Sequence, residues 1–192
     1  METCRLIATD LACRRGERLL FAGLNLKAGA GTALQVTGPN GTGKSSLIRI
    51  LAGLLRPYAG EVDRAGGVAL LDERPALDEH QPLGKALGFW NRVDRGEDAG
   101  LEALGLFDLL DVPVRYLSTG QRKRAAIARL LGQEAEIWLL DEPLNGLDTH
   151  AAATLLRIVD EHRDAGGIAV IASHQPFDLS GLASLHLPDC QP

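Results

Sequence analysis

A glycine-rich segment in the first quarter of the chain has the residue types that hold phosphate groups. Residues 38–46 read Gly-Pro-Asn-Gly-Thr-Gly-Lys-Ser-Ser and match the pattern G-x-x-x-x-G-K-[ST] at each defined position. Glycines let the backbone curl so that successive N–H groups point at phosphate oxygens. Lys44 is expected to neutralise the β- and γ-phosphates of ATP, and the Ser45 hydroxyl to ligate Mg²⁺. The expected nucleotide contacts from this segment are Gly38, Pro39, Asn40, Gly41, Thr42, Gly43, Lys44, Ser45 and Ser46.

The residues on either side of this segment place it between a strand and a helix. Residues 33–36 form a short, mostly apolar run before it. Apolar residues follow at helical spacing, and Pro57 and Gly60 are expected to end that helix. The helical apolar positions are Leu47, Ile48, Ile50, Leu51, Leu54 and Leu55. A helix N-terminus at the loop adds its dipole to the anion site, which makes a chance glycine turn a poor explanation.

Two carboxylates and a histidine follow other predicted strands. Asp141 and Glu142 come directly after the apolar run 137–140, and His174 follows the run 168–172. Asp141 is expected to hold Mg²⁺ through water, and Glu142 to act as the general base on the attacking water. His174 is expected to contact the γ-phosphate and steady Glu142. The alternatives are a simple turn at Asp-Glu-Pro and a structural histidine.

A fourth motif begins a helix. Residues 117–121 read Leu-Ser-Thr-Gly-Gln and precede apolar residues at helical spacing as far as Leu131. Ser118 is therefore a candidate N-cap, and the helix start presents N–H groups and a positive dipole to an anion. A cap with no further role is the alternative. The predicted nucleotide contacts in this motif are Leu117, Ser118, Thr119, Gly120 and Gln121.

Strands that alternate with helices predict an α/β fold with a mostly parallel sheet, preceded by short β segments over residues 3–37. Ligands of such sheets bind at the carboxyl ends of the strands, so the motifs above should meet at one edge. Strand signals are missing between Asp72 and Pro113, where helical spacing appears over 83–93 and 101–110. We therefore expect one domain, with core segments 1–74 and 131–192 and a helical lobe over about 75–130. A helix over 151–163 and a short tail complete the core.

The bulk properties exclude several classes of protein. The chain has 192 residues and a net charge of −5, so it has no basic field for nucleic acid. Arg122-Lys123-Arg124 is interpreted as a solvated face that also adds positive charge near the phosphates. No segment has the ~20 apolar residues of a membrane span, and residues 1–5 lack a signal-peptide pattern. The three cysteines, at wide spacing, are expected to be free thiols in a reducing cytoplasm. Membrane association must then come through a partner.

In order and combination, these motifs resemble those of the ATP-binding cassette (ABC) ATPases over essentially the whole chain. Residues 38–46 resemble the Walker A loop, 117–121 the signature, 137–142 Walker B and 145–148 the D-loop, with His174 as the switch histidine. The resemblance implies a RecA-like core and adds Asp148 to the nucleotide contacts. It also implies a head-to-tail dimer with two ATP molecules, each between Lys44 of one chain and Ser118 of the other.

Within that family the chain is similar to the ATPase subunits of bacterial cytochrome c maturation systems. The similarity rests on the segments 10–13, 20–24, 87–90 and 118–124 and on the short tail after His174. It implies transmembrane permease subunits as partners, a place at the cytoplasmic face of the bacterial inner membrane, and haem export or release of a haem carrier. Phe89 and Trp90 are either core residues of the lobe or part of a socket for the membrane partner.

Two positions depart from the family pattern. Arg74 stands where the family has a glutamine, and arginine cannot ligate Mg²⁺ because it has no acceptor. Arg15 stands near the usual adenine-stacking aromatic, where a guanidinium can also stack on the base. The alternatives are an ABC ATPase for another small exported substrate, a non-transport ABC ATPase in DNA repair or translation, and a non-hydrolysing nucleotide-gated module. An ordinary phosphate-loop kinase or GTPase would not need residues 117–121.

Overall fold

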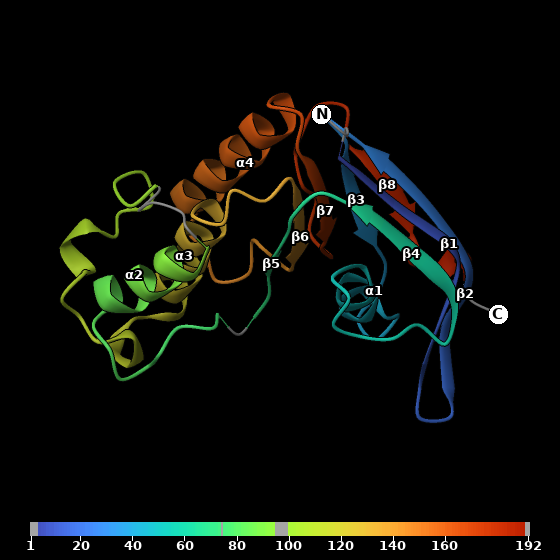
Figure 1. Ribbon diagram of the computed structural model, residues 1–192, viewed down its shortest axis with the longest axis horizontal. Coiled ribbons are helices and arrows are strands. Elements are labelled where there is room, and N and C mark those ends of the chain that lie inside the picture. Colours follow the sequence, from blue (N-terminus) through green and yellow to red (C-terminus); the bar gives the residue numbers. More distant parts are fainter. Residues whose placement is uncertain (1–3, 74, 95–99, 191–192) are drawn as a thin grey trace.

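A parallel sheet forms the centre of the molecule in the computed structural model, which describes residues 4–73, 75–94 and 100–190 (Figure 1). Its strand order is β5-β6-β7-β3-β8, and each pair of neighbours is parallel. The strands are β3 (Ala33–Thr37), β5 (Val68–Leu71), β6 (Ile137–Asp141), β7 (Ile168–Ala172) and β8 (Ala183–His186). The predicted mostly parallel α/β sheet is confirmed. Strand β8 was not predicted, because its four residues are largely exposed and lack an apolar run.

A second, antiparallel sheet packs beside the first. Its order is β2-β1-β4, formed by β1 (Arg5–Arg15), β2 (Arg18–Gly29) and β4 (Ala59–Ala65). Helix α1 (Lys44–Leu51) lies between the two sheets, and its apolar residues share a core with both (Figure 1). This arrangement holds the start of α1, and with it the phosphate loop, against the central sheet.

Helix α1 ends earlier than its apolar spacing predicts. The predicted helix continued through Leu54 and Leu55, but the observed one stops at Leu51. Gly53 follows with a φ of 78°, in the left-handed region that ends helices. Leu54 is 69% exposed, so it belongs to the surface and not to the helix core.

Three longer helices lie on the other side of the central sheet, where the second and third pack on its strands and the first packs against the second (Figure 1). They are α2 (Leu83–Asp94), α3 (Thr119–Leu131) and α4 (Thr149–Asp164), and they agree with the predicted helices at 83–93, after 118 and at 151–163. The helix predicted over 101–110 is wrong. Turns and a short 3-10 helix over Phe107–Leu109 occupy this stretch, where Gly105 takes a φ of 59°.

Strand β6 shows why the core strands read as continuous apolar runs. Ile137 and Leu139 face the core shared with α1, whereas Trp138 and Leu140 face the helices on the opposite side. A parallel sheet covered on both faces needs apolar residues at every position. The run ends where the strand reaches the sheet edge, and the next residues are Asp141 and Glu142.

Candidate functional site

The phosphate loop joins β3 to α1 in a conformation that only glycine adopts easily. Gly38 and Gly43 have φ values of 143° and 107°, and Gly43 is the N-cap of α1. A Cβ on Gly43 would lie 3.2 Å from both Leu20 Cβ and Phe21 Cδ1. The antiparallel sheet therefore presses on the loop at this position, and any side chain would push the loop out of place.

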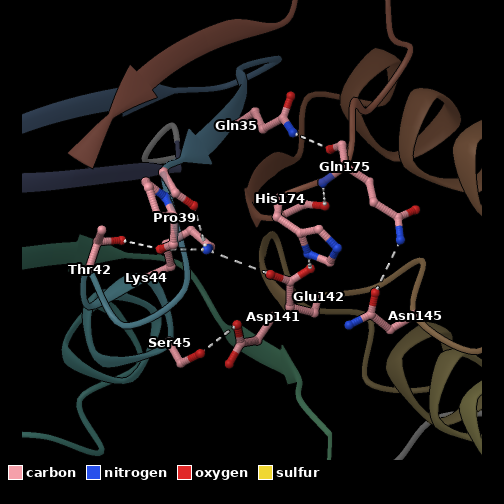
Figure 2. Close-up of polar contacts among 12 residues, drawn as sticks. Gln35, Pro39, Thr42, Lys44, Ser45, Asp141, Glu142, Asn145, His174 and Gln175 are labelled. Carbon is pink, nitrogen blue, oxygen red and sulfur yellow. Dashed lines mark hydrogen bonds and ion pairs between the residues drawn. The ribbon is translucent and has the colours of Figure 1, made fainter. Parts of the chain in front are cut away.

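Lys44 extends along the inner side of the loop. Its ammonium donates to the carbonyls of Gly38, at 2.8 Å, and Pro39, at 3.3 Å. It also lies 3.8 Å from Oε1 of Glu142 (Figure 2). The lysine is buried, so its positive charge is little screened by water and is concentrated where phosphates would approach.

Ser45 and Asp141 form a hydroxyl–carboxylate pair beneath the loop. The Ser45 hydroxyl donates to Oδ1 of Asp141 at 3.0 Å (Figure 2). Burial raises the pKa of Asp141, the hydrogen bond from Ser45 opposes this, and the nearby carboxylates of Glu142 and Glu73 raise the pKa further. A hydroxyl beside a buried carboxylate fits the oxygen donors that Mg²⁺ prefers, and a cation there would relieve the cost of burying the charge.

Glu142 and His174 contact each other across two neighbouring strand ends. Nδ1 of His174 lies 2.8 Å from Oε2 of Glu142, while its ring is partly open to solvent (Figure 2). The Glu142 backbone has a φ of 45°, and its N–H donates to the carbonyl of Ala172 at 2.8 Å. This left-handed turn is uncommon for a residue with a side chain and is found at functional sites. It turns Glu142 toward Lys44 while Asp141 stays under Ser45.

Lys44, Ser45, Glu142 and His174 line a pocket of about 380 Å³ at the carboxyl edge of the sheet, and Asp141 reaches it through its hydrogen bond with Ser45. Of the residues expected from sequence, the pocket is lined by Asn40, Gly41, Gly43, Lys44, Ser45, Ser46, Glu142 and His174. It is also lined by Leu20, Glu73 and Asn145, none of which was predicted as a nucleotide contact, although Asn145 begins the segment that resembles the D-loop. Glu73 follows β5 at the same edge, so the rule that ligands bind at strand ends would have found it.

The signature residues lie elsewhere. Ser118 is the N-cap of α3 in a capping box: its hydroxyl accepts from the Gln121 N–H, and the Gln121 side chain accepts from the Ser118 N–H. A Cβ on Gly120 would lie 2.7 Å from the carbonyl of Gly146, so the signature packs closely on the D-loop. Among the described residues, residues 117–121 do not line the pocket that contains Lys44.

Three other residues were singled out from the sequence: Asp148, Arg15 and Arg74. Asp148 caps α4, where its Oδ1 accepts from the Ala151 N–H at 2.8 Å. Arg15 is exposed at the end of β1 and is not among the described residues lining the pocket. Arg74 lies outside the described residues.

Phe89 and Trp90 differ in exposure, which bears on whether they belong to the core of the helical lobe or to a surface for the membrane partner. Trp90 is half-buried, donates to the Ala76 carbonyl and packs under the Arg129 guanidinium, 3.8 Å from the ring centroid. Phe89 is 52% exposed. Both line a surface pocket of about 790 Å³ on the helical lobe. Trp90 thus supports the lobe while Phe89 offers an apolar surface.

Comparison with known proteins agrees with this geometry. Residues 21–145 match the family model described as ABC transporter. The chain belongs to the ABC transporter family. An ABC transporter ATP-binding protein from Pyrococcus furiosus has the same fold, with a TM-score of 0.84 at 22% identity over 98% of this chain and 100% of that chain. The protein is accordingly an ABC-type ATPase that binds nucleotide.

Relatives within the ABC family are considerably closer in sequence. The chain is 57% identical, over the full length of both, to a Novosphingobium aromaticivorans protein named cytochrome c biogenesis ATP-binding export protein CcmA. It is 53% identical to the Sphingopyxis alaskensis protein of the same name, over 94% of this chain and 95% of that protein. None of the helices in the described residues has the length and apolar character needed to cross a bilayer.

Proposed function

We propose that this ABC ATPase hydrolyses Mg-ATP to drive a membrane partner in c-type cytochrome biogenesis, through haem export or release of a haem carrier. The contact between Glu142 and His174, opposite Lys44, is the observation that carries the hydrolytic part. The biogenesis part is supported by the names of relatives that are 57% and 53% identical to this chain.

The chemistry follows from the groups at the pocket. Lys44 and the loop N–H groups bind the phosphates, and Ser45 and Asp141 hold Mg²⁺, which neutralises charge on the phosphate oxygens when bound. Glu142 accepts the proton of the attacking water. His174 steadies Glu142 through Nδ1. Its other ring nitrogen, Nε2, orients the water toward the γ-phosphate.

A second copy of the chain supplies the rest of the site. Ser118 and the start of α3 present a hydroxyl, N–H groups and a helix dipole, but they do not line their own pocket among the described residues. A head-to-tail dimer would bring them against the ATP held by Lys44 of the other copy. Asp148 belongs to the loop that would lie at this interface, and Arg15 would stack on the base.

The membrane partner consists of transmembrane permease subunits, and the chain is a peripheral subunit at the cytoplasmic face of the bacterial inner membrane. The pocket beside Phe89 and Trp90 is the surface offered for docking. Its exposed aromatic ring and its two basic residues, Lys85 and Arg92, which outnumber the one acidic residue, Asp78, suit a partner segment with apolar and acidic residues.

ATPase measurements and affinity purification test this proposal. The purified chain should hydrolyse ATP in a Mg²⁺-dependent manner, and the tagged chain should co-purify with polytopic membrane proteins needed for c-type cytochrome formation. Nucleotide binding without turnover, under saturating Mg-ATP and with the partner present, would favour a non-hydrolysing module. Turnover with a different membrane complex would favour export of another small substrate.

A further inference from the structure

A buried glutamine contacts the segment that carries the histidine. Gln35 lies in β3, inside the central sheet, and is 8% exposed. Its side-chain amide donates to the backbone carbonyl of Gln175 at 2.7 Å, between positions 140 residues apart in sequence (Figure 2). A side chain that only filled space in a parallel sheet would be apolar, so this amide is explained by the hydrogen bond it makes.

The residues on both sides of His174 are held in place. The Gln175 N–H donates to the Ser173 hydroxyl at 3.0 Å, and Ser173 is itself buried, with its own N–H donated to the Val36 carbonyl at 3.2 Å. Strand β3 therefore fixes residue 173 through its backbone and residue 175 through the Gln35 side chain. His174 lies between these two anchors, which hold its backbone in the position from which the ring reaches Glu142.

Gln175 also reaches the D-loop. Its side-chain amide donates to Oδ1 of Asn145 at 3.4 Å (Figure 2). The Asn145 N–H donates to the Glu142 carbonyl at 3.3 Å. With the bond between His174 and Glu142, these contacts close a ring through four residues: Glu142, His174, Gln175 and Asn145. A shift of Asn145 would be transmitted to the histidine.

We propose that Gln35 and Gln175 are positioning residues that hold His174 against Glu142 and join this pair to the D-loop. The inference rests on the proposed hydrolytic function and adds two residues that act through the histidine without touching nucleotide. Gln35 sets the histidine backbone from the core of the sheet. Gln175 links it to Asn145, on the loop that would face the second copy of the chain.

Removal of each amide should lower turnover and leave nucleotide affinity unchanged. Gln35→Met keeps the length of the side chain and loses the donor to the Gln175 carbonyl; we expect kcat to fall about tenfold or more, because small misplacements of a reacting group are costly. Gln175→Met keeps that carbonyl and loses only the Asn145 contact; we expect about a threefold to tenfold fall in kcat. Gln133→Met, just after α3 and away from this ring, is the matched control and should behave as wild type.

Three measurements separate positioning from general damage to the fold. The dissociation constant of a fluorescent ATP analogue should stay within about twofold of wild type in both variants. The imidazole ¹H–¹⁵N signals of His174, assigned with His174→Asn, should shift in Gln35→Met and Gln175→Met but not in Gln133→Met. Circular dichroism and thermal melting then report whether each variant is folded.

The outcomes are distinct. A kcat within about twofold of wild type in both variants, or unchanged His174 signals, would overturn the proposal. Parallel losses of kcat and nucleotide affinity would also overturn it, because they would indicate a structural role. If Gln35→Met does not fold, the exposed Gln175 still decides the question. A wild-type chain without ATPase activity would refute the proposed function, while the His174 signals would still test the positioning.

Discussion

Glu142 bonds to His174 through one carboxylate oxygen and faces Lys44 through the other. Oε2 lies 2.8 Å from Nδ1 of His174, which is 32 positions away in sequence, and Oε1 lies 3.8 Å from the Lys44 ammonium. The carboxylate is thus placed between an imidazole and a cation, on a left-handed backbone turn. This arrangement joins three segments of the chain in one site and makes Glu142 the residue whose replacement tells most about mechanism.

Glu142→Gln should retain ATP binding and lose nearly all turnover. The amide keeps the shape of the side chain but cannot accept a proton, and general base catalysis is typically worth about 10²–10⁴-fold. ATP-dependent pairing should persist, because the nucleotide is no longer consumed. ATPase rate and size-exclusion mass in Mg-ATP measure both effects. Glu61→Gln, on the exposed face of β4, is the control, and more than about half the wild-type rate in Glu142→Gln would refute the general-base role.

Lys44→Ala should weaken nucleotide binding before anything else. The substitution removes a buried positive charge facing the phosphate site, and charge-assisted bonds are worth about 1.5–3 kcal/mol. We expect the dissociation constant of a fluorescent ATP analogue to rise by about 10–100-fold. Lys27→Ala, exposed on β2, changes the same residue type away from the loop and should have no effect. An equal affinity in both variants would show that Lys44 does not contact the phosphates.

Ser118→Arg should bind ATP as a monomer and fail to pair. The long side chain would occupy the place of the other copy's γ-phosphate, whereas Ser118 does not line its own pocket among the described residues. Analytical ultracentrifugation with Mg-ATP in the Glu142→Gln background measures the pairing. Ser184→Arg, exposed on β8, adds the same charge elsewhere and should still pair.

Mixing two inactive variants tests the shared site more strictly. A dimer of Ser118→Arg with Lys44→Ala has one intact composite site, formed by Lys44 of the first copy and Ser118 of the second. Its other site has lost both halves. ATPase activity in the mixture should therefore exceed the sum of the separate variants. Wild-type hydrolysis by Ser118→Arg alone would contradict the sandwich dimer.

His162 should make the stability of the fold sensitive to acid. Its ring stacks on Trp138 with centroids 3.7 Å apart, and burial lowers its pKa below the ordinary value of 6.5. The unfolded chain therefore takes up a proton on His162 at a higher pH than the folded chain does. The stability that neutral His162 contributes to the fold is present above about pH 6.5 and is lost as the pH falls through the folded pKa. His162→Phe keeps the aromatic stack, and its free energy of unfolding in urea should fall less between about pH 7.5 and pH 5. His150→Phe, exposed on α4, is the control, and an equal slope in wild type and His162→Phe would exclude His162 as the cause.

Local chemistry explains why much of the fold could be predicted. The runs at 137–140 and 168–172 are apolar at every position because both faces of the sheet are covered, and each ends in polar residues at the sheet edge. The glycines of the phosphate loop and the Ser118 N-cap are equally local, since a few neighbouring residues set the backbone angles. Predictions from apolar spacing alone were less accurate. They extended α1 past Leu51 and placed a helix over 101–110, whereas glycines with positive φ turn the chain in both places.

The sequence by itself determined which residues are predicted to carry the chemistry: the phosphate loop, the carboxylates after β6, the histidine after β7 and the cap of α3. The tertiary structure decided which of them meet. Strand order places β7 between β6 and β3, so His174 lies beside Glu142 and the amide of Gln35 reaches Gln175. No local pattern encodes those contacts, because each joins segments far apart in sequence and depends on how the strands are paired. The same pairing leaves Ser118 away from the pocket of its own chain.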